Sequence, residues 1–130
     1  MAGVSDDQDV RPLRLVPALV DLRDRYGDPI WILGVELWTN MVVLRFAGVE
    51  TEMTMMHSYA DWFFLRDDCG TAYHPVGGGS AGGDVGSPLE HKRRFSGHLD
   101  FAPGLAAGAT TLTVSFSARI DSEPIDIRID

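Results

Sequence analysis

The chain has 130 residues, of which 45% are hydrophobic, and its formal net charge is −8. This length suits one domain that buries about two thirds of the surface of the extended chain. The hydrophobic fraction excludes global disorder. Cys69 is the only cysteine, so no internal disulfide can form, and we expect its thiol to be buried and inert. The negative charge argues against nonspecific binding to nucleic acid or to an anionic membrane, because both require a basic surface.

The N-terminal residues 1–11 are polar and acidic, and we expect them to form a flexible arm. They lack the basic and apolar regions of a signal peptide. No stretch of the chain approaches the ~18 apolar residues that a membrane helix needs. The sequence therefore predicts a cytoplasmic protein that makes no membrane contact, or an extracytoplasmic one if a signal or anchor has been removed.

The first apolar segment runs from Leu13 to Leu22 and is interrupted by Pro17. Its apolar residues predict an extended strand. Because proline cannot donate to a sheet ladder, this strand should lie at a sheet edge or bend between sheets. A short helix over residues 17–25, with its charged residues facing solvent, is the competing interpretation.

The central part of the chain predicts a hairpin that follows a turn at residues 26–29. Residues 30–38 alternate as a strand, with one face formed by Trp31, Leu33, Val35 and Leu37. Thr39-Asn40 forms the expected hairpin tip, since Asn tolerates left-handed dihedrals, and residues 41–49 return as the second strand.

Two short strands, at residues 61–66 and 71–75, flank an expected turn at Asp67-Asp68-Cys69-Gly70. Residues 76–87 follow, and six of these twelve residues are glycine. This segment has little to bury and loses much backbone entropy on ordering. We therefore expect a long mobile Gly-rich loop at 76–87.

Alternating patterns return at Phe95–Phe101, Thr111–Ile120 and Ile125–Ile129. The whole chain thus shows seven to nine short strands and no confident long helix. This pattern favours a sandwich or a barrel. We expect an all-β fold, a single two-sheet immunoglobulin-like sandwich that covers residues 12–130.

Two motifs carry a family resemblance. Leu65–Tyr73 has the form strand, Asp-Asp, Gly-Thr, Tyr, and Phe101-Ala102-Pro103-Gly104 precedes the strand Thr111–Phe116. The resemblance that they carry covers about half of the chain. In these features the chain resembles uncharacterised immunoglobulin-like sandwich domains of bacterial extracytoplasmic and anti-sigma-type proteins. The resemblance implies a sandwich fold but no particular activity, because such sandwiches host many functions.

Residues with metal-binding or catalytic chemistry form no recognisable motif. The four histidines lack the close spacing of metal sites; they are His57, His74, His91 and His98. The pair Asp67-Asp68 suits a turn cap better than a calcium loop. Gly78–Gly82 has the spacing of a nucleophile elbow but no helix follows it. We assign no catalytic, cofactor or metal site. A metal site assembled across strands from His74, His98 and nearby acids remains the alternative.

The sequence therefore predicts a noncatalytic protein-interaction or structural module that needs no cofactor. Aromatic and methionine side chains are enriched at interfaces. Trp38, at the hairpin tip, together with Met41 and the Gly-rich loop, is the expected contact surface, whereas Trp31 and Trp62 should pack in the core. The partner is an unknown protein, or a second copy bound through an edge strand at Ile125–Ile129. The alternative function is a small metal-dependent binder or enzyme.

Overall fold

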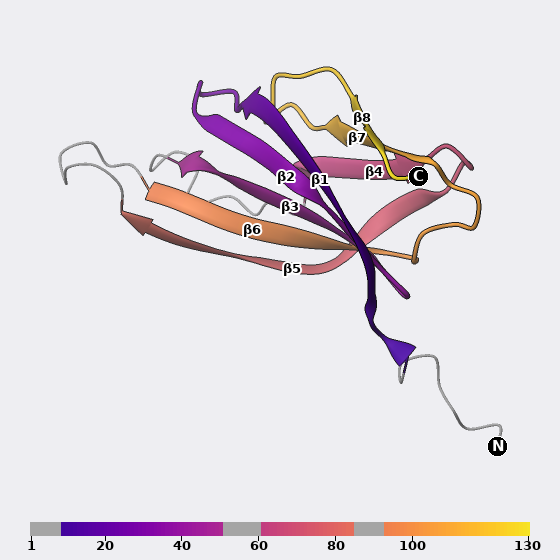
Figure 1. Ribbon diagram of the computed structural model, residues 1–130. Helices are drawn as coiled ribbons and strands as arrows, with labels where there is room; N and C mark the ends of the chain where they lie inside the picture. Colours follow the sequence, from indigo (N-terminus) through magenta and orange to yellow (C-terminus); the bar gives the residue numbers. More distant parts are fainter. Residues whose placement is uncertain (1–8, 51–60, 85–92) are drawn as a thin grey trace.

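The computed structural model describes residues 9–50, 61–84 and 93–130, which form eight antiparallel strands (Figure 1). The strands are β1 (Pro12–Arg23), β2 (Pro29–Trp38), β3 (Val42–Glu50), β4 (Phe63–Asp67), β5 (Ala72–Asp84), β6 (Arg93–Ala102), β7 (Thr111–Phe116) and β8 (Ile125–Arg128). The all-β prediction is confirmed. Within these described ranges, no helix is long and apolar enough to cross a membrane.

Strand pairing joins all eight strands into one nearly closed sheet in the order β1-β2-β3-β6-β5-β4-β7-β8. β1 lies at one end of this order, as Pro17 predicts, and the helical interpretation of residues 17–25 is wrong. The two ends of the sheet approach each other at an isolated bridge between Asp24 and Ile120. The arrangement is therefore barrel-like.

The core lies between two parts of this curved sheet. β5 pairs with β4 only at Ala72 and Tyr73, and it pairs with β6 from His74 onward. Figure 1 shows β4, β7 and β8 on one side of the larger part of the sheet, which contains β1, β2, β3, β6 and β5. The rings of Phe46 on β3 and Phe63 on β4 have centroids 5.3 Å apart, so the two parts pack against each other through buried aromatic side chains.

A bulge in β2 changes which of its residues face outward. The pairing between β2 and β3 shifts register between Ile32 and Gly34. Leu33 is consequently exposed while Val35 is fully buried. The prediction that these two residues share one face of the strand is therefore wrong. Gly34 makes the bulge possible, because its φ is +151° and a Cβ there would lie 2.5 Å from the Val16 carbonyl oxygen. After the bulge, Glu36 and Trp38 lie on the outer face.

The prediction of a Gly-rich loop at 76–87 is wrong for residues 76–84, which belong to β5. Main-chain pairing with β6 replaces the side-chain burial that this segment lacks. Residues 85–87 lie outside the described part of the chain, as do residues 1–8 of the expected N-terminal arm. Within that arm, Asp9 and Arg11 contact Thr39: the Thr39 hydroxyl donates to the Asp9 carbonyl at 2.8 Å.

The β1–β2 and β4–β5 hairpins share one turn structure. In the first, Asp24 Oδ1 accepts from the main-chain N–H groups of Tyr26 and Asp28, at 2.8 and 2.9 Å. In the second, Asp67 Oδ1 accepts from the residues two and four positions later, both at 2.9 Å. The third residue after each aspartate is a glycine with φ near +85° to +89°. Each aspartate thus caps its own hairpin turn.

Candidate functional site

The outer face of β2, β3 and β6 carries a row of charged and polar side chains. Arg45 on β3 pairs in register with His98 on β6, and Glu36 on β2 lies next to Arg45. Asp100 follows two residues after His98, so it points to the same face. Three adjacent strands therefore bring Glu36, Arg45, His98 and Asp100 together; we call this set the polar row.

Glu36 fixes one end of the polar row. Its Oε2 accepts a hydrogen bond from Arg45 Nε, and its Oε1 accepts one from Trp38 Nε1 at 2.9 Å. The hydrogen bond from Arg45 holds the pKa of the Glu36 carboxyl below its ordinary value, against the opposing effect of burial. Glu36 is therefore ionised, and it orients both Arg45 and the Trp38 indole.

Asp100 fixes the other end. His98 Nδ1 lies 2.9 Å from Asp100 Oδ1. A carboxylate only accepts, so Nδ1 carries the proton in this hydrogen bond and Nε2 remains the second polar atom of the ring. This contact holds the imidazole in one orientation on the outer face.

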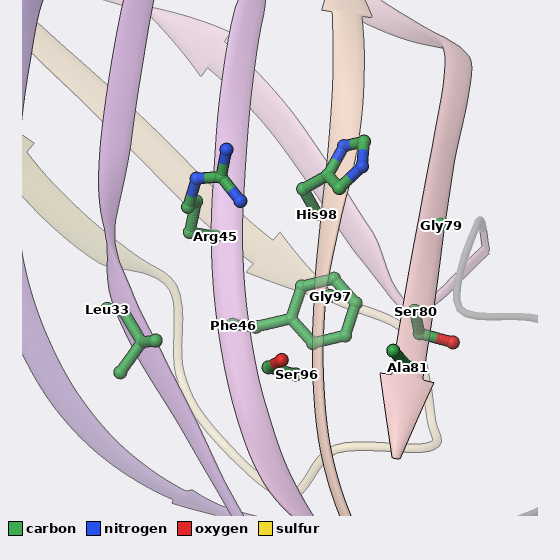
Figure 2. Close-up of a pocket in the computed structure, with 9 residues that line it drawn as sticks. All are labelled: Leu33, Arg45, Phe46, Gly79, Ser80, Ala81, Ser96, Gly97 and His98. Carbon is green, nitrogen blue, oxygen red and sulfur yellow. The ribbon is translucent and has the colours of Figure 1, made fainter.

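A hollow of about 440 Å³ lies on the β5 side of Arg45, and we call it the His98 hollow. Figure 2 shows Leu33, Arg45 and His98 on neighbouring strands, with Gly79, Ser80 and Ala81 across from them on β5. Phe46 points into the core beneath it, where its ring packs under Gly97. The floor of the hollow is therefore mostly main chain.

A second hollow, of about 570 Å³, lies on the β1 side of Arg45, and we call it the Trp38 hollow. Leu13 and Leu15 of β1 line it and are 57% and 65% exposed. Trp38, Glu36 and Arg45 line it from β2 and β3. Arg45 thus stands between two hollows, one lined by polar side chains and glycines and the other by exposed leucines.

The structure places the expected contact residues at one turn. Trp38 lines the Trp38 hollow and is half-buried. Met41 is also half-buried, and its carbonyl accepts from the Trp38 main-chain N–H at 2.9 Å. Trp62 is buried in the core as expected, but Trp31 is only partly buried because it lies on the outer side of β2.

The candidate metal ligands do not converge. His74 pairs with Ala102 and His98 with Gly79, which separates the two histidines by about four residues, or about 13 Å, along β6. Among the residues that the structure describes, no group of three His, Cys, Asp or Glu side chains is placed to hold a metal ion. His57 and His91 lie outside the described residues.

The expected burial of Cys69 is wrong, because the turn that carries it is exposed. Partial desolvation, with the neighbouring charges of Asp67 and Asp68, raises the pKa of the thiol. A thiol with a raised pKa is a poor nucleophile at neutral pH. The adjacent carboxylate of Asp68 is engaged with the Thr110 main-chain N–H at 2.9 Å and with the Thr110 hydroxyl at 2.6 Å.

Sequence reasoning missed Glu36, Arg45 and Asp100 as members of one site. Two pairs of this site could have been found from the sequence, because residues two apart on a strand point to the same face. These pairs are Glu36 with Trp38 and His98 with Asp100. Arg45 joins the pairs only through the alignment of β2, β3 and β6. Comparisons with protein-family models, with curated proteins and with solved structures found no match.

Proposed function

We propose that this chain is a noncatalytic interaction module and that a protein partner binds at the Trp38 hollow. The observation that carries the proposal is the pair of exposed leucines, Leu13 and Leu15, on the edge strand β1 next to Trp38. Contiguous exposed apolar side chains rimmed by polar groups are typical of protein interaction sites.

The composition of the hollow also supports a protein partner. Tryptophan and arginine are the residues most enriched at the centres of protein interfaces. The Glu36 carboxylate already orients Trp38 and Arg45, so binding would lose little side-chain entropy there. The partner would insert apolar side chains between the leucines and Trp38 and place polar groups around Arg45.

We also propose that the barrel-like sheet corresponds to the two layers of an immunoglobulin-like sandwich. The short pairing of β5 with β4, at Ala72 and Tyr73 only, supports a division between the two layers. The larger layer then contains β1, β2, β3, β6 and most of β5, and it carries both hollows on its outer face.

A homodimer through the edge strand at Ile125–Ile129 stays a prediction. Arg14 of β1 donates to the carbonyl oxygens of Ile129 and Asp130, so the end of this strand is already contacted within the chain. The exposed leucines of β1 offer a larger apolar contact than β8, whose length is four residues.

Leu15→Asp tests the proposed partner site, with Phe64→Asp as the matched control. Both residues are exposed, but Phe64 lies on β4, away from the Trp38 hollow. We expect Leu15→Asp to weaken capture of the native partner by at least about tenfold, since truncating an interface anchor costs about 2 kcal/mol. Phe64→Asp should bind as the unaltered protein does, and thermal melting should show that both variants fold.

Two results would contradict the proposal. One is equal capture of the same partner by the Leu15→Asp variant and the unaltered protein. The other is a stoichiometric metal in the purified protein, measured by elemental analysis, because it would favour the metal-dependent alternative over a noncatalytic module.

A further inference from the structure

The His98 hollow exists because β5 lacks side chains where it passes the polar row. Gly79 pairs with His98, and Gly77 pairs with Asp100. A Cβ at Gly79 would lie 3.8 Å from His98 Nε2, and one at Gly77 would lie 3.4 Å from Asp100 Oδ2. A large side chain at either position would cover these polar atoms. The glycines therefore leave the imidazole and the carboxylate accessible from outside.

The groups around the hollow are both donors and acceptors of hydrogen bonds. Arg45 only donates, Asp100 only accepts, and the His98 ring has a second nitrogen beyond the one that contacts Asp100. Ser96, exposed and two residues before His98 on the same face, can donate and accept. Glu36 and Asp100 hold Arg45 and His98 in place, so the set is ordered before a ligand arrives.

The charge of the site disfavours an anionic ligand. Arg45 is balanced by Glu36, and His98 faces Asp100, so the polar row offers no net positive charge to an anion. The whole chain carries −8, which adds repulsion for anions. Leu33, which is 42% exposed, provides an apolar wall on the β2 side.

We propose that the His98 hollow binds a neutral sugar. A pyranose is uncharged, its hydroxyl groups donate and accept at fixed spacing, and its ring carries C–H faces that can pack on Leu33. A hollow of about 440 Å³ with a few convergent polar groups and an apolar wall has the size and make-up of a small-molecule site. The bare main chain of β5 lets such a ligand approach closely. This site shares Arg45 with the Trp38 hollow but lies on the other side of that residue, and it does not rest on the proposed protein partner.

Nuclear magnetic resonance titration with glucose, galactose, mannose and N-acetylglucosamine at millimolar concentration tests the proposal. We expect at least one sugar to shift the amide signals of Gly79, Ser96 and His98 in a saturable way. Absence of shifts with all four sugars would overturn the proposal. Saturable shifts with inorganic phosphate and with none of the sugars would overturn it as well, since they would assign an anion to the hollow.

Gly79→Val fills the hollow and serves as the blocking variant. Gly79 does not have a positive φ, and its Cβ position makes only ordinary contacts, so the sheet should tolerate the substitution. We expect at least about a tenfold loss of sugar affinity. His98→Ala should cause a similar loss by removing a polar partner, and it decides the question if Gly79→Val unfolds. Full sugar binding by His98→Ala, or by a folded Gly79→Val variant, would overturn the proposal.

The Leu15→Asp variant separates this proposal from the proposed function. Leu15 lines the Trp38 hollow and not the His98 hollow. We expect this variant to bind sugar as the unaltered protein does, even where it loses the protein partner. Loss of sugar binding in a folded Leu15→Asp variant would contradict the separation of the two sites.

Discussion

Asp67 shows how a buried carboxylate can hold a turn together. The residue is only 5% exposed, and its Oδ2 accepts a hydrogen bond from the Tyr73 hydroxyl at 2.7 Å. Burial alone would raise the pKa of Asp67, but hydrogen bonds from Tyr73 and from the main-chain N–H groups of Thr71 and Cys69 lower it below the ordinary value. The pKa of Tyr73 rises to about 12, through burial and then through its bond to Asp67. Both shifts follow from one ordered hydrogen-bond network.

Asp67→Asn should destabilise the protein by about 1–3 kcal/mol at neutral pH, because hydrogen bonds to a charged acceptor are lost. The folded-state pKa of Asp67 lies below its ordinary value of 3.8. Its contribution to stability is therefore complete above that ordinary pKa and is lost as pH falls through the folded-state pKa. Urea unfolding at a series of pH values measures the difference between the two proteins, which should shrink in acid.

The control for this series is Asp61→Asn, at an exposed position. It should change stability by less than about 0.5 kcal/mol. A stability difference between Asp67→Asn and the unaltered protein that stays constant into strong acid would show that the charge of Asp67 contributes nothing.

At the scale of elements, side-chain burial was readable from the sequence and main-chain pairing was not. β6 was predicted correctly, since Phe95, Leu99 and Phe101 alternate with polar residues and are buried. The second half of β5 has no such pattern, because glycine has no apolar side chain to bury. Its order comes from pairing with β6, which depends on residues far along the chain.

The candidate site, like the fold, was predictable only where it depends on local sequence features. Trp38 was identified because its position at a hairpin tip is a local feature. Its neighbours in the polar row depend on the alignment of three strands, and the bulge before Gly34 decides that Glu36 faces outward. A single inserted residue reverses the face of everything that follows it, and periodicity alone does not reveal such an insertion.

Gly78→Ala and Gly79→Ala should have different effects on stability, although the two positions are adjacent on β5. Gly78 has a φ of +154°, and a Cβ there would lie 2.5 Å from the His98 carbonyl oxygen. We expect a loss of about 1–3 kcal/mol at this position, from backbone strain and the clash. At Gly79 the Cβ fits, and alanine should be neutral or stabilise by up to about 1 kcal/mol. Thermal and urea unfolding measure both. Equal effects of the two substitutions would contradict the described path of β5.

The described part of the molecule contains two three-stranded units with common features, β1–β2–β3 and β4–β5–β6, which meet where β3 pairs with β6. Their first hairpins share the aspartate-capped turn. Their bulges, before Gly34 and before Gly77, follow the capping aspartate at the same distance. Leu44–Ala47 and Leu99–Ala102 have matching apolar residues around Arg45 and Asp100. The polar row thus lies where the two units join, and β7 and β8 complete the barrel.

Closure of that barrel depends on a seam that joins β1 and the residues just after it to the segments on either side of β8. At one end, the Arg25 main-chain N–H donates to the Arg119 carbonyl at 2.9 Å, next to the bridge between Asp24 and Ile120. At the other end, the Arg14 guanidinium donates to the carbonyl oxygens of Ile129 and Asp130. Between these ends, β8 is held by its pairing with β7. The Arg14 side chain therefore connects β1 to the C-terminal residues through hydrogen bonds.

Arg14→Ala should release β8 without unfolding the rest of the sheet. The loss of hydrogen bonds worth about 1–1.5 kcal/mol should speed amide hydrogen exchange in β8 by about tenfold, while β3 and β6 keep their protection. Arg128→Ala is the matched control, because that side chain is exposed and pairs only with the neighbouring Asp130 among the described contacts. Unchanged exchange in β8 would show that Arg14 does not close the seam. In a two-layered arrangement, β7 and β8 can loosen while the strands of the polar row stay in place. Faster exchange in all strands would contradict that arrangement and would show that the barrel opens as one cooperative unit.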